Sequence, residues 1–176
     1  MTDELVRLEA QIRAAFESTP RPDSGGLRGS GEGDEPFLLE AEFRHLPDWR
    51  QVDAAFIDRA PDGFGSALSF FSNEAFRYYL PAYLLADLGE QLQQANPLFH
   101  LWHGLADSQR DTAVNEGRYG NWTWFEAVSD RFRGFAPPEV AAIVAYMRYK
   151  AEHDELGLDR PMIEQALRNY WLKCPE

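Results

Sequence analysis

Cysteine and long apolar runs are scarce in this sequence, and each scarcity excludes a class of protein. The one cysteine, Cys174, has no second thiol for an intrachain disulfide or a cysteine-based zinc site. No stretch approaches the roughly 20 apolar residues of a transmembrane helix. The opening Met-Thr-Asp-Glu-Leu-Val-Arg also lacks the basic and apolar regions of a signal peptide. We therefore expect a soluble cytoplasmic protein that folds without disulfides or metal.

Basic residues are few relative to acidic ones. The 176 residues include 17 Lys and Arg against 29 Asp and Glu, which gives a formal net charge of −12. Neither side of residue 60 is a basic arm, since residues 1–60 hold 13 acidic and 7 basic side chains and residues 61–176 hold 16 and 10. Such a chain is repelled by nucleic acid and by anionic membranes, so we predict neither as a partner. The negative charge favours solubility, which is its simplest interpretation. A more specific interpretation is an acidic face that binds a basic surface of another protein.

Catalytic signatures are also missing. The sequence contains no Gly-x-Ser-x-Gly elbow and no Ser-x-x-Lys pair. The glycine cluster at 25–33 lacks the spacing and the lysine of a phosphate-binding loop, and the nearby Glu32, Asp34 and Glu35 would repel phosphate. Nothing here points to a specific enzyme, and we predict no cofactor.

Helical periodicity is what the sequence does contain. Apolar residues recur at three- and four-residue spacing over most of the chain, and no region alternates with the period of two that a large sheet requires. We predict an all-α fold, an irregular multi-helix bundle with at most a small β-hairpin at 37–43 or 67–71. The expected helices begin at or just after Thr2, Asp48, Ser72, Asn96, Thr123, Pro137 and Asp159, where capping residues or proline mark a start. The helix from Asp48 is expected to continue to the stop at 61–63, and the helix from Pro137 to end at Gly157.

Three regions are expected along the chain. Residues 1–18 form an N-terminal amphipathic helix, and residues 37–176 form one helical domain. Between them, 19–36 reads as a flexible linker, because residues 20–36 hold five glycines and three prolines with almost nothing to bury. The first helix is either a mobile arm or folds back on the body. We favour folding back, because Leu8 and Phe16 need an apolar partner.

The best-marked helix begins after Ser72, which is a preferred N-cap residue. Phe71 and Phe76 occupy the two positions of a hydrophobic staple. The helix is apolar on all sides, as expected of one buried in the middle of a domain. Pro81 lies inside it and removes a backbone donor, so we expect a bend there.

The bend defines a candidate ligand site. Irregular backbone at Pro81 would lie beside Arg77, Tyr78, Tyr79 and Asp87, which could line a pocket for a small ligand or substrate. Asp87 shares the apolar stripe and would need a partner if buried. The alternative is that the bend turns Asp87 into solvent.

Two weaker candidates lie further along the chain. His100 and His103 are spaced i and i+3 on a predicted helix, but two histidines are too few for a metal site, and we predict none. Trp122 and Trp124 flank the start of another helix and cannot easily both point inward. One of them is therefore a candidate anchor for a protein partner. Arginines beside aromatics elsewhere, as at 76–79, are interpreted as part of the core rather than as a nucleic-acid surface.

Three segments carry a resemblance to a known family. The run Phe-Arg-Tyr-Tyr-Leu-Pro-Ala-Tyr-Leu within residues 69–85 resembles the hallmark segment of an uncharacterised bacterial family, catalogued only as a domain of unknown function. Residues 135–146 and the closing Ala-Leu-Arg-Asn-Tyr-Trp at 166–171 fit the same pattern. Many relatives carry a Glu-Cys pair where this chain has Leu39-Glu40-Ala41. The resemblance implies no activity, cofactor or catalytic residue.

Two hypotheses of function follow from the sequence. The leading one is a non-enzymatic acidic interaction module of immunity, adaptor or regulatory type, with a basic protein surface as its partner. The alternative is a small-ligand-binding protein or enzyme with a pocket at the Pro81 bend.

Overall fold

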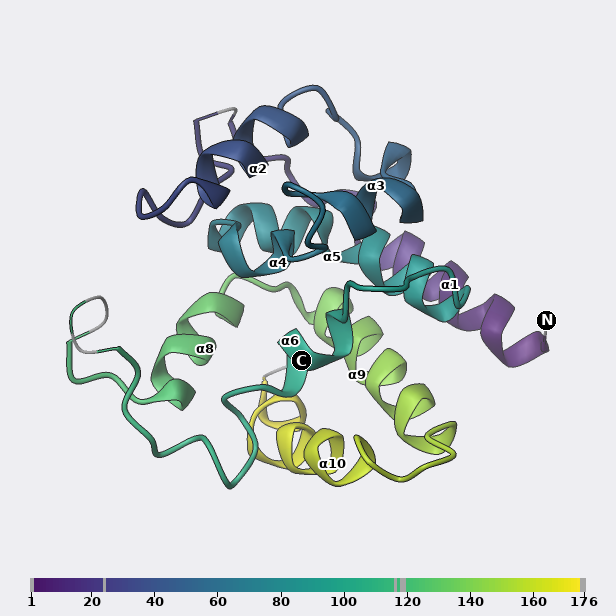
Figure 1. The fold of residues 1–176 in the computed structure, drawn as a ribbon. Coiled ribbons are helices and arrows are strands. Elements are labelled where there is room, and N and C mark those ends of the chain that lie inside the picture. Colours follow the sequence, from purple (N-terminus) through teal and green to yellow (C-terminus); the bar gives the residue numbers. More distant parts are fainter. Residues whose placement is uncertain (1, 24, 116, 118–119, 175–176) are drawn as a thin grey trace. The chain divides into compact units, whose positions relative to one another are not determined.

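The computed structural model describes residues 2–23, 25–115, 117 and 120–174. These residues contain nine α-helices and no strand, which confirms the all-α prediction. Both segments considered for a hairpin are largely helical, and only two isolated β-bridges occur in the described chain. The structure consists of two compact units, Met1–His100 (unit 1) and Leu101–Glu176 (unit 2). Figure 1 traces the helices of each unit.

Unit 1 is organised around α5 (Asn73–Leu88). This helix packs against α1, η1 and α3, and eleven of its sixteen residues are buried, so the expectation of a helix buried on all sides is confirmed. It runs without interruption through Pro81. The remaining elements of unit 1 are α1 (Asp3–Ala15), α2 (Glu35–Phe43), η1 (Trp49–Gln51), α3 (Ala54–Arg59) and α4 (Ala67–Phe70), and α6 (Pro97–Trp102) crosses into unit 2.

The first helix folds back onto the body of unit 1. Leu8, Ile12 and Phe16 are buried, and α1 packs along α5 (Figure 1). Thr2 caps the helix by accepting a hydrogen bond from the Leu5 backbone N–H. The apolar stripe read from the sequence is therefore the stripe that α5 covers.

The glycine-rich segment contributes more to packing than its composition indicated. We expected almost nothing to bury there, but Leu27 is completely buried, and its carbonyl accepts a hydrogen bond from Ser72 N–H at 2.9 Å. Arg28 bonds Glu40 at 2.9 Å. At Gly29 the backbone passes so close to Phe71 that an added Cβ would lie 2.6 Å from the Phe71 carbonyl oxygen. The segment is thus held by main-chain bonds, while the division at residues 18 and 36 stays a prediction.

The single helix predicted from Asp48 is wrong in its extent. The segment forms two short helices, η1 and α3, separated by extended backbone at Val52. The Asp48 side chain accepts from Arg50 N–H, and the Asp53 side chain accepts from Phe56 N–H at 2.7 Å. Because a second N-cap aspartate lies five residues after the first, the chain starts a new helix instead of extending the old one.

Unit 2 contains α8 (Trp124–Phe132), α9 (Pro137–Glu152), α10 (Arg160–Asn169) and η2 (Trp171–Lys173). The predicted capping box of Thr123 and Glu126 is present, with both reciprocal bonds. Trp171 is buried and donates its indole N–H to the Leu101 carbonyl at 2.9 Å. α9 ends five residues before Gly157, the stop expected from the sequence. Among the described residues, no helix combines the length and apolarity needed to cross a bilayer.

One carboxylate holds a loop of unit 1 in place. Asp58 of α3 accepts backbone hydrogen bonds from Gln93, Gln94 and Ala95 at 2.7–2.9 Å. Burial acts to raise the pKa of this carboxyl, but the three N–H donors outweigh it and lower the pKa below its ordinary value of 3.8. The charged form of Asp58 therefore stabilises the folded state.

Asp58→Asn tests this linkage through the pH dependence of unfolding. The folded-state pKa is depressed, so the stabilisation is fully present above pH 3.8 and is lost as the pH falls through the lower folded value. We expect the free energy of unfolding of the wild type to exceed that of the variant at neutral pH, and the difference to shrink below pH 3.8. Denaturant titrations at several pH values measure it. Asp23→Asn, at an exposed residue, is the control, and a pH-independent difference would contradict the assignment.

Candidate functional site

A groove of about 260 Å³ opens on unit 1, beside the half of α5 that follows Pro81. Its walls come from α1, from η1 with the start of α3, and from α5 and the turn after it. These elements meet because the apolar faces of α1 and η1 both pack on α5. The lining residues are Glu9, Arg13, Trp49, Arg50, Val52, Asp53, Ala54, Ala82, Leu85, Ala86, Gly89 and Gln91.

Two of the four charged side chains of the groove already have a bonding partner among the residues that the structure describes, and two do not. Arg50 bonds Asp48 at 3.1 Å and the Glu17 carbonyl at 3.3 Å, and Asp53 caps α3. Glu9 and Arg13, one turn apart on α1, make no hydrogen bond or ion pair with the described part of the chain. One carboxylate and one guanidinium are therefore available to a ligand in the groove.

An indole forms part of the groove wall. Trp49 is 1% exposed, and the Arg50 guanidinium lies over its ring, 4.6 Å from the ring centre. Small side chains, Ala82 and Ala86, line the facing stretch of α5. The groove thus joins an apolar wall to a rim with both signs of charge, an arrangement suited to a small zwitterion.

The two predicted tyrosines lie elsewhere and are used in packing. Tyr78 and Tyr79 are buried and donate their hydroxyls to the Pro47 and Leu46 carbonyls, each at 2.8 Å. Arg21 also donates to the Tyr79 hydroxyl at 3.4 Å. Burial raises the pKa of both phenols. The pair holds the 46–47 turn against α5, and neither residue lines the groove.

Arg77 and Asp87, the other two predicted ligand-binding residues, are partly buried on α5 and do not line the groove either. The structure therefore does not bring the four predicted residues together around this cavity. The groove borders the same helix but is lined by other residues of it, Ala82, Leu85 and Ala86, and the predicted binding role of the four stays a prediction. Sequence reasoning missed Glu9 and Arg13, which read as ordinary polar positions of an amphipathic helix.

Tyr83 and Glu42 form a second buried polar feature of unit 1. Burial raises the pKa of the Tyr83 phenol, and the nearby Tyr79 and Glu42 act in the same direction. Within the described residues neither the Tyr83 hydroxyl nor Glu42 Oε2 has a hydrogen-bond partner. A phenol in this environment stays protonated at neutral pH, so it is unsuited to act as a general base.

The comparison with family models gives one match. Residues 2–174 fit the model of a family of unknown function (DUF6714). The chain belongs to this family. The match covers the groove, the tyrosines of α5 and almost all of unit 2, so these belong to the family domain. Its description assigns no activity.

No curated protein matches the chain. No solved structure matches it either.

The two tryptophans proposed as a partner anchor differ in exposure. Trp122 is 42% exposed, whereas Trp124 is partly buried and packs edge-to-face on His103, with ring centres 4.7 Å apart. Of the two, Trp122 is available to a partner. Its role in binding stays a prediction.

The two candidate histidines lie in different units. His100 contacts the rings of Phe76 and Phe99, and His103 contacts those of Trp102 and Trp124. Burial lowers the pKa of His103. Among the described residues there is no group of three or more His, Cys, Asp or Glu side chains that could hold a metal.

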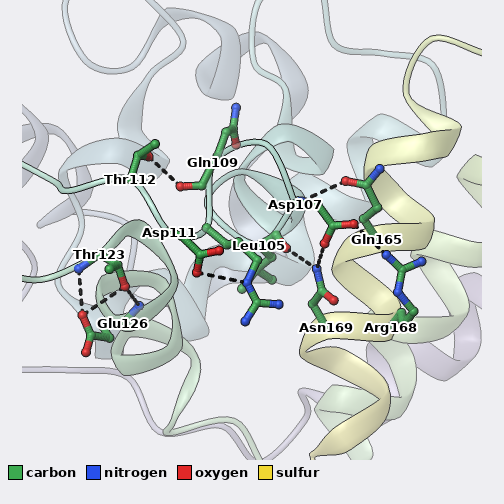
Figure 2. A network of polar contacts seen from close by, with 11 residues as sticks. Leu105, Asp107, Gln109, Asp111, Thr112, Thr123, Glu126, Gln165, Arg168 and Asn169 are labelled. Carbon is green, nitrogen blue, oxygen red and sulfur yellow. Dashed lines mark hydrogen bonds and ion pairs between the residues drawn. The ribbon is translucent and has the colours of Figure 1, made fainter.

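A polar network in unit 2 joins the segment after α6 to α10 (Figure 2). Asn169 donates its side-chain amide to the Leu105 carbonyl at 2.8 Å and to Asp107 Oδ1 at 2.7 Å. Arg168 bonds Asp107 Oδ2 at 2.9 Å, and Gln165 accepts from the Asp107 N–H. Both carboxylate oxygens of Asp107 accept hydrogen bonds, so the network stabilises the fold and leaves neither oxygen available for catalysis.

Asn169→Ala tests that role. The change leaves the Leu105 carbonyl without its buried donor, so we expect a loss of about 1–3 kcal/mol in the free energy of unfolding. Chemical denaturation measures it. Glu164→Ala on the same helix removes only an exposed pair with Arg160 and should change stability by less than about 1 kcal/mol. Equal effects of the two variants would count against a special role for Asn169.

Proposed function

We propose that this chain is a non-enzymatic interaction module of the cytoplasm, of immunity, adaptor or regulatory type, whose acidic surface binds a basic surface of another protein. The acidic excess is concentrated in unit 1, which holds 17 acidic and 8 basic residues, against 12 and 9 in unit 2. A partner of opposite charge would be attracted over a distance before contact, which raises the rate of association.

The observation that carries the proposal is the way unit 1 uses its arginines. Arg28 pairs with Glu40, and Arg50 with Asp48. Arg21 donates to Tyr79 and to two backbone carbonyls. Arg28 and Arg50 each neutralise one carboxylate, and Arg21 is bound within the unit, so none of the three offsets the remaining acidic side chains.

The carboxylates of unit 1 outnumber its basic side chains, so many exposed carboxylates have no cation to pair with. Glu32 and Asp34, in the turn that leads into α2, and Glu35, the first residue of α2, are all exposed. The nearest cation in sequence, Arg28, is held by Glu40 at 2.9 Å. This turn is the surface that we expect a basic partner to cover.

Binding of such a partner must weaken with salt. We expect proteins captured by the purified chain from native cytosol at about 0.01 M salt to be largely released at about 0.15 M, where the screening length falls from about 30 Å to about 8 Å. Triple replacement of Glu32, Asp34 and Glu35 by lysine should reduce capture. The control is Asp111→Lys, at an exposed aspartate of unit 2. Asp107 is not used because its carboxylate bonds Arg168 and Asn169. Capture that is insensitive to salt and to the triple variant would refute the proposal.

The groove favours a second candidate function, binding of a small molecule. Glu9 and Arg13 offer a carboxylate and a guanidinium beside an apolar wall, a pattern that fits the ammonium and carboxylate groups of an amino acid. The cavity lies along the part of α5 that follows Pro81, near where the sequence placed the alternative pocket. In this reading the domain senses a metabolite rather than a protein.

An NMR titration with free glycine, L-glutamate and L-arginine tests the second candidate. We expect backbone amide shifts confined to α1, η1 and the end of α5 on binding. The double variant Glu9→Ala, Arg13→Ala should abolish these shifts. Arg7→Ala, on α1 but outside the groove, is the matched control. Shifts that persist in the double variant, or no shifts with any of the three compounds, would reject the idea.

A further inference from the structure

The loop between α9 and α10 presents two leucines to solvent. Leu156 is 81% exposed and Leu158 is 72% exposed, the highest values among the large apolar side chains of the described chain. A single exposed leucine is ordinary on a protein surface. Two of them with only Gly157 between them form a compact apolar tip.

The loop is held in one conformation by hydrogen bonds. Asp154 Oδ2 accepts from the backbone N–H of Asp159 and of Arg160, each at 2.8 Å, and the Asp154 carbonyl accepts from Gly157 at 3.1 Å. The N–H of Arg160 is the main cause that holds the pKa of the Asp154 carboxyl below its ordinary value. Gly157 adopts the left-handed region, with φ of 65°. The leucines are therefore preorganised, which lowers the entropic cost of binding through them.

The acidic excess of unit 2 lies in this same loop. Residues 152–160 contain four acidic side chains and one basic one, whereas the rest of unit 2 contains eight of each. The one cation, Arg160, is paired with Glu164 at 3.0 Å. Glu152 and Glu155 are exposed. The two leucines are therefore flanked in sequence by an excess of acidic side chains, in a unit whose other residues are balanced in charge.

Other exposed apolar side chains lack this combination. The ring of Phe37 is 48% exposed, but the Arg28 guanidinium lies 4.2 Å from its centre. Leu172 is 53% exposed and sits beside Lys173. Phe64, at 69%, stands alone between two glycines. Among these four places in the described part of the chain, the 152–160 loop is the one that joins paired leucines, a fixed backbone and a charge excess of one sign.

We propose that the 152–160 loop is a docking element, in which Leu156 and Leu158 enter an apolar socket of a partner protein whose rim carries lysine or arginine. The proposal rests on the proposed function and adds a second contact surface, on unit 2, to the acidic turn before α2. The charge argues for this occupant, because anionic lipid headgroups and the same loop of a second copy would both be repelled.

Site-specific photo-cross-linking in native cells tests the contact. The benzophenone amino acid p-benzoyl-L-phenylalanine replaces Leu156, and in a matched control it replaces Leu172. We expect the chain labelled at 156 to cross-link to a partner protein through an apolar segment flanked by lysine or arginine, with no such product from 172. Cross-linking to a second copy or to lipid, to a segment without basic residues, or equally from both positions would overturn the proposal.

Affinity measurements on this chain and its cross-linked partner, both purified, then distinguish failure of the docking element from failure of the proposed function. Leu156→Ser with Leu158→Ser should weaken binding at least about tenfold, because both apolar side chains that enter the socket are lost. Glu155→Lys should weaken it less and reduce its salt dependence, and Leu172→Ser should leave it unchanged. These side chains are exposed, so thermal unfolding of the variants should match the wild type. If a salt-sensitive partner binds the double-serine variant with full affinity, the docking element is wrong and the proposed function stands. If no salt-sensitive partner exists, both fail.

Discussion

Burial of α5 on every side is the constraint on which unit 1 depends. A helix enclosed in this way needs a hydrogen-bond partner for each polar group that it carries into the interior, although the Tyr83 hydroxyl has none among the described residues. Tyr78 and Tyr79 meet this demand by donating to the carbonyls of Pro47 and Leu46, which holds the turn before η1 against the helix. Ser72 caps the first turn and also donates to the Gly26 carbonyl. The positions of η1 and of the glycine-rich segment thus follow from the needs of one helix.

Local features of the fold were predictable because their causes are local. The N-cap at Ser72, the capping box at Thr123 and the proline start at Pro137 depend on residues three or four apart, and the structure has all of them. The end of α9 was misjudged for the opposite reason. Asp154 lies beyond that end, and its carboxylate accepts hydrogen bonds from the backbone at the start of α10. The apolar periodicity of either helix alone does not predict a contact of this kind between the two.

The candidate site was less predictable than the fold. The sequence directs attention to the polar residues of α5, but on a helix buried all round such residues are consumed by packing, as Tyr78 and Tyr79 are. The free charges of the groove, Glu9 and Arg13, are instead on α1, about seventy residues earlier in the chain. Only the packing of α1 on α5 gives them a cavity to face. The charge excess, by contrast, was visible from composition, although its division between the two units was not.

The close passage of Gly29 past Phe71 bears on how this family can vary. A Cβ added at Gly25 would enter open space, whereas a Cβ at residue 29 would lie 2.6 Å from the Phe71 carbonyl oxygen and would have to displace it. The Gly29 N–H also bonds the Phe70 carbonyl at 2.7 Å, which fixes the approach. Homologous chains should therefore drift in length and composition before this point and keep a glycine at it. The Phe71 carbonyl oxygen, rather than the overall abundance of glycine, therefore determines which position of the segment requires glycine.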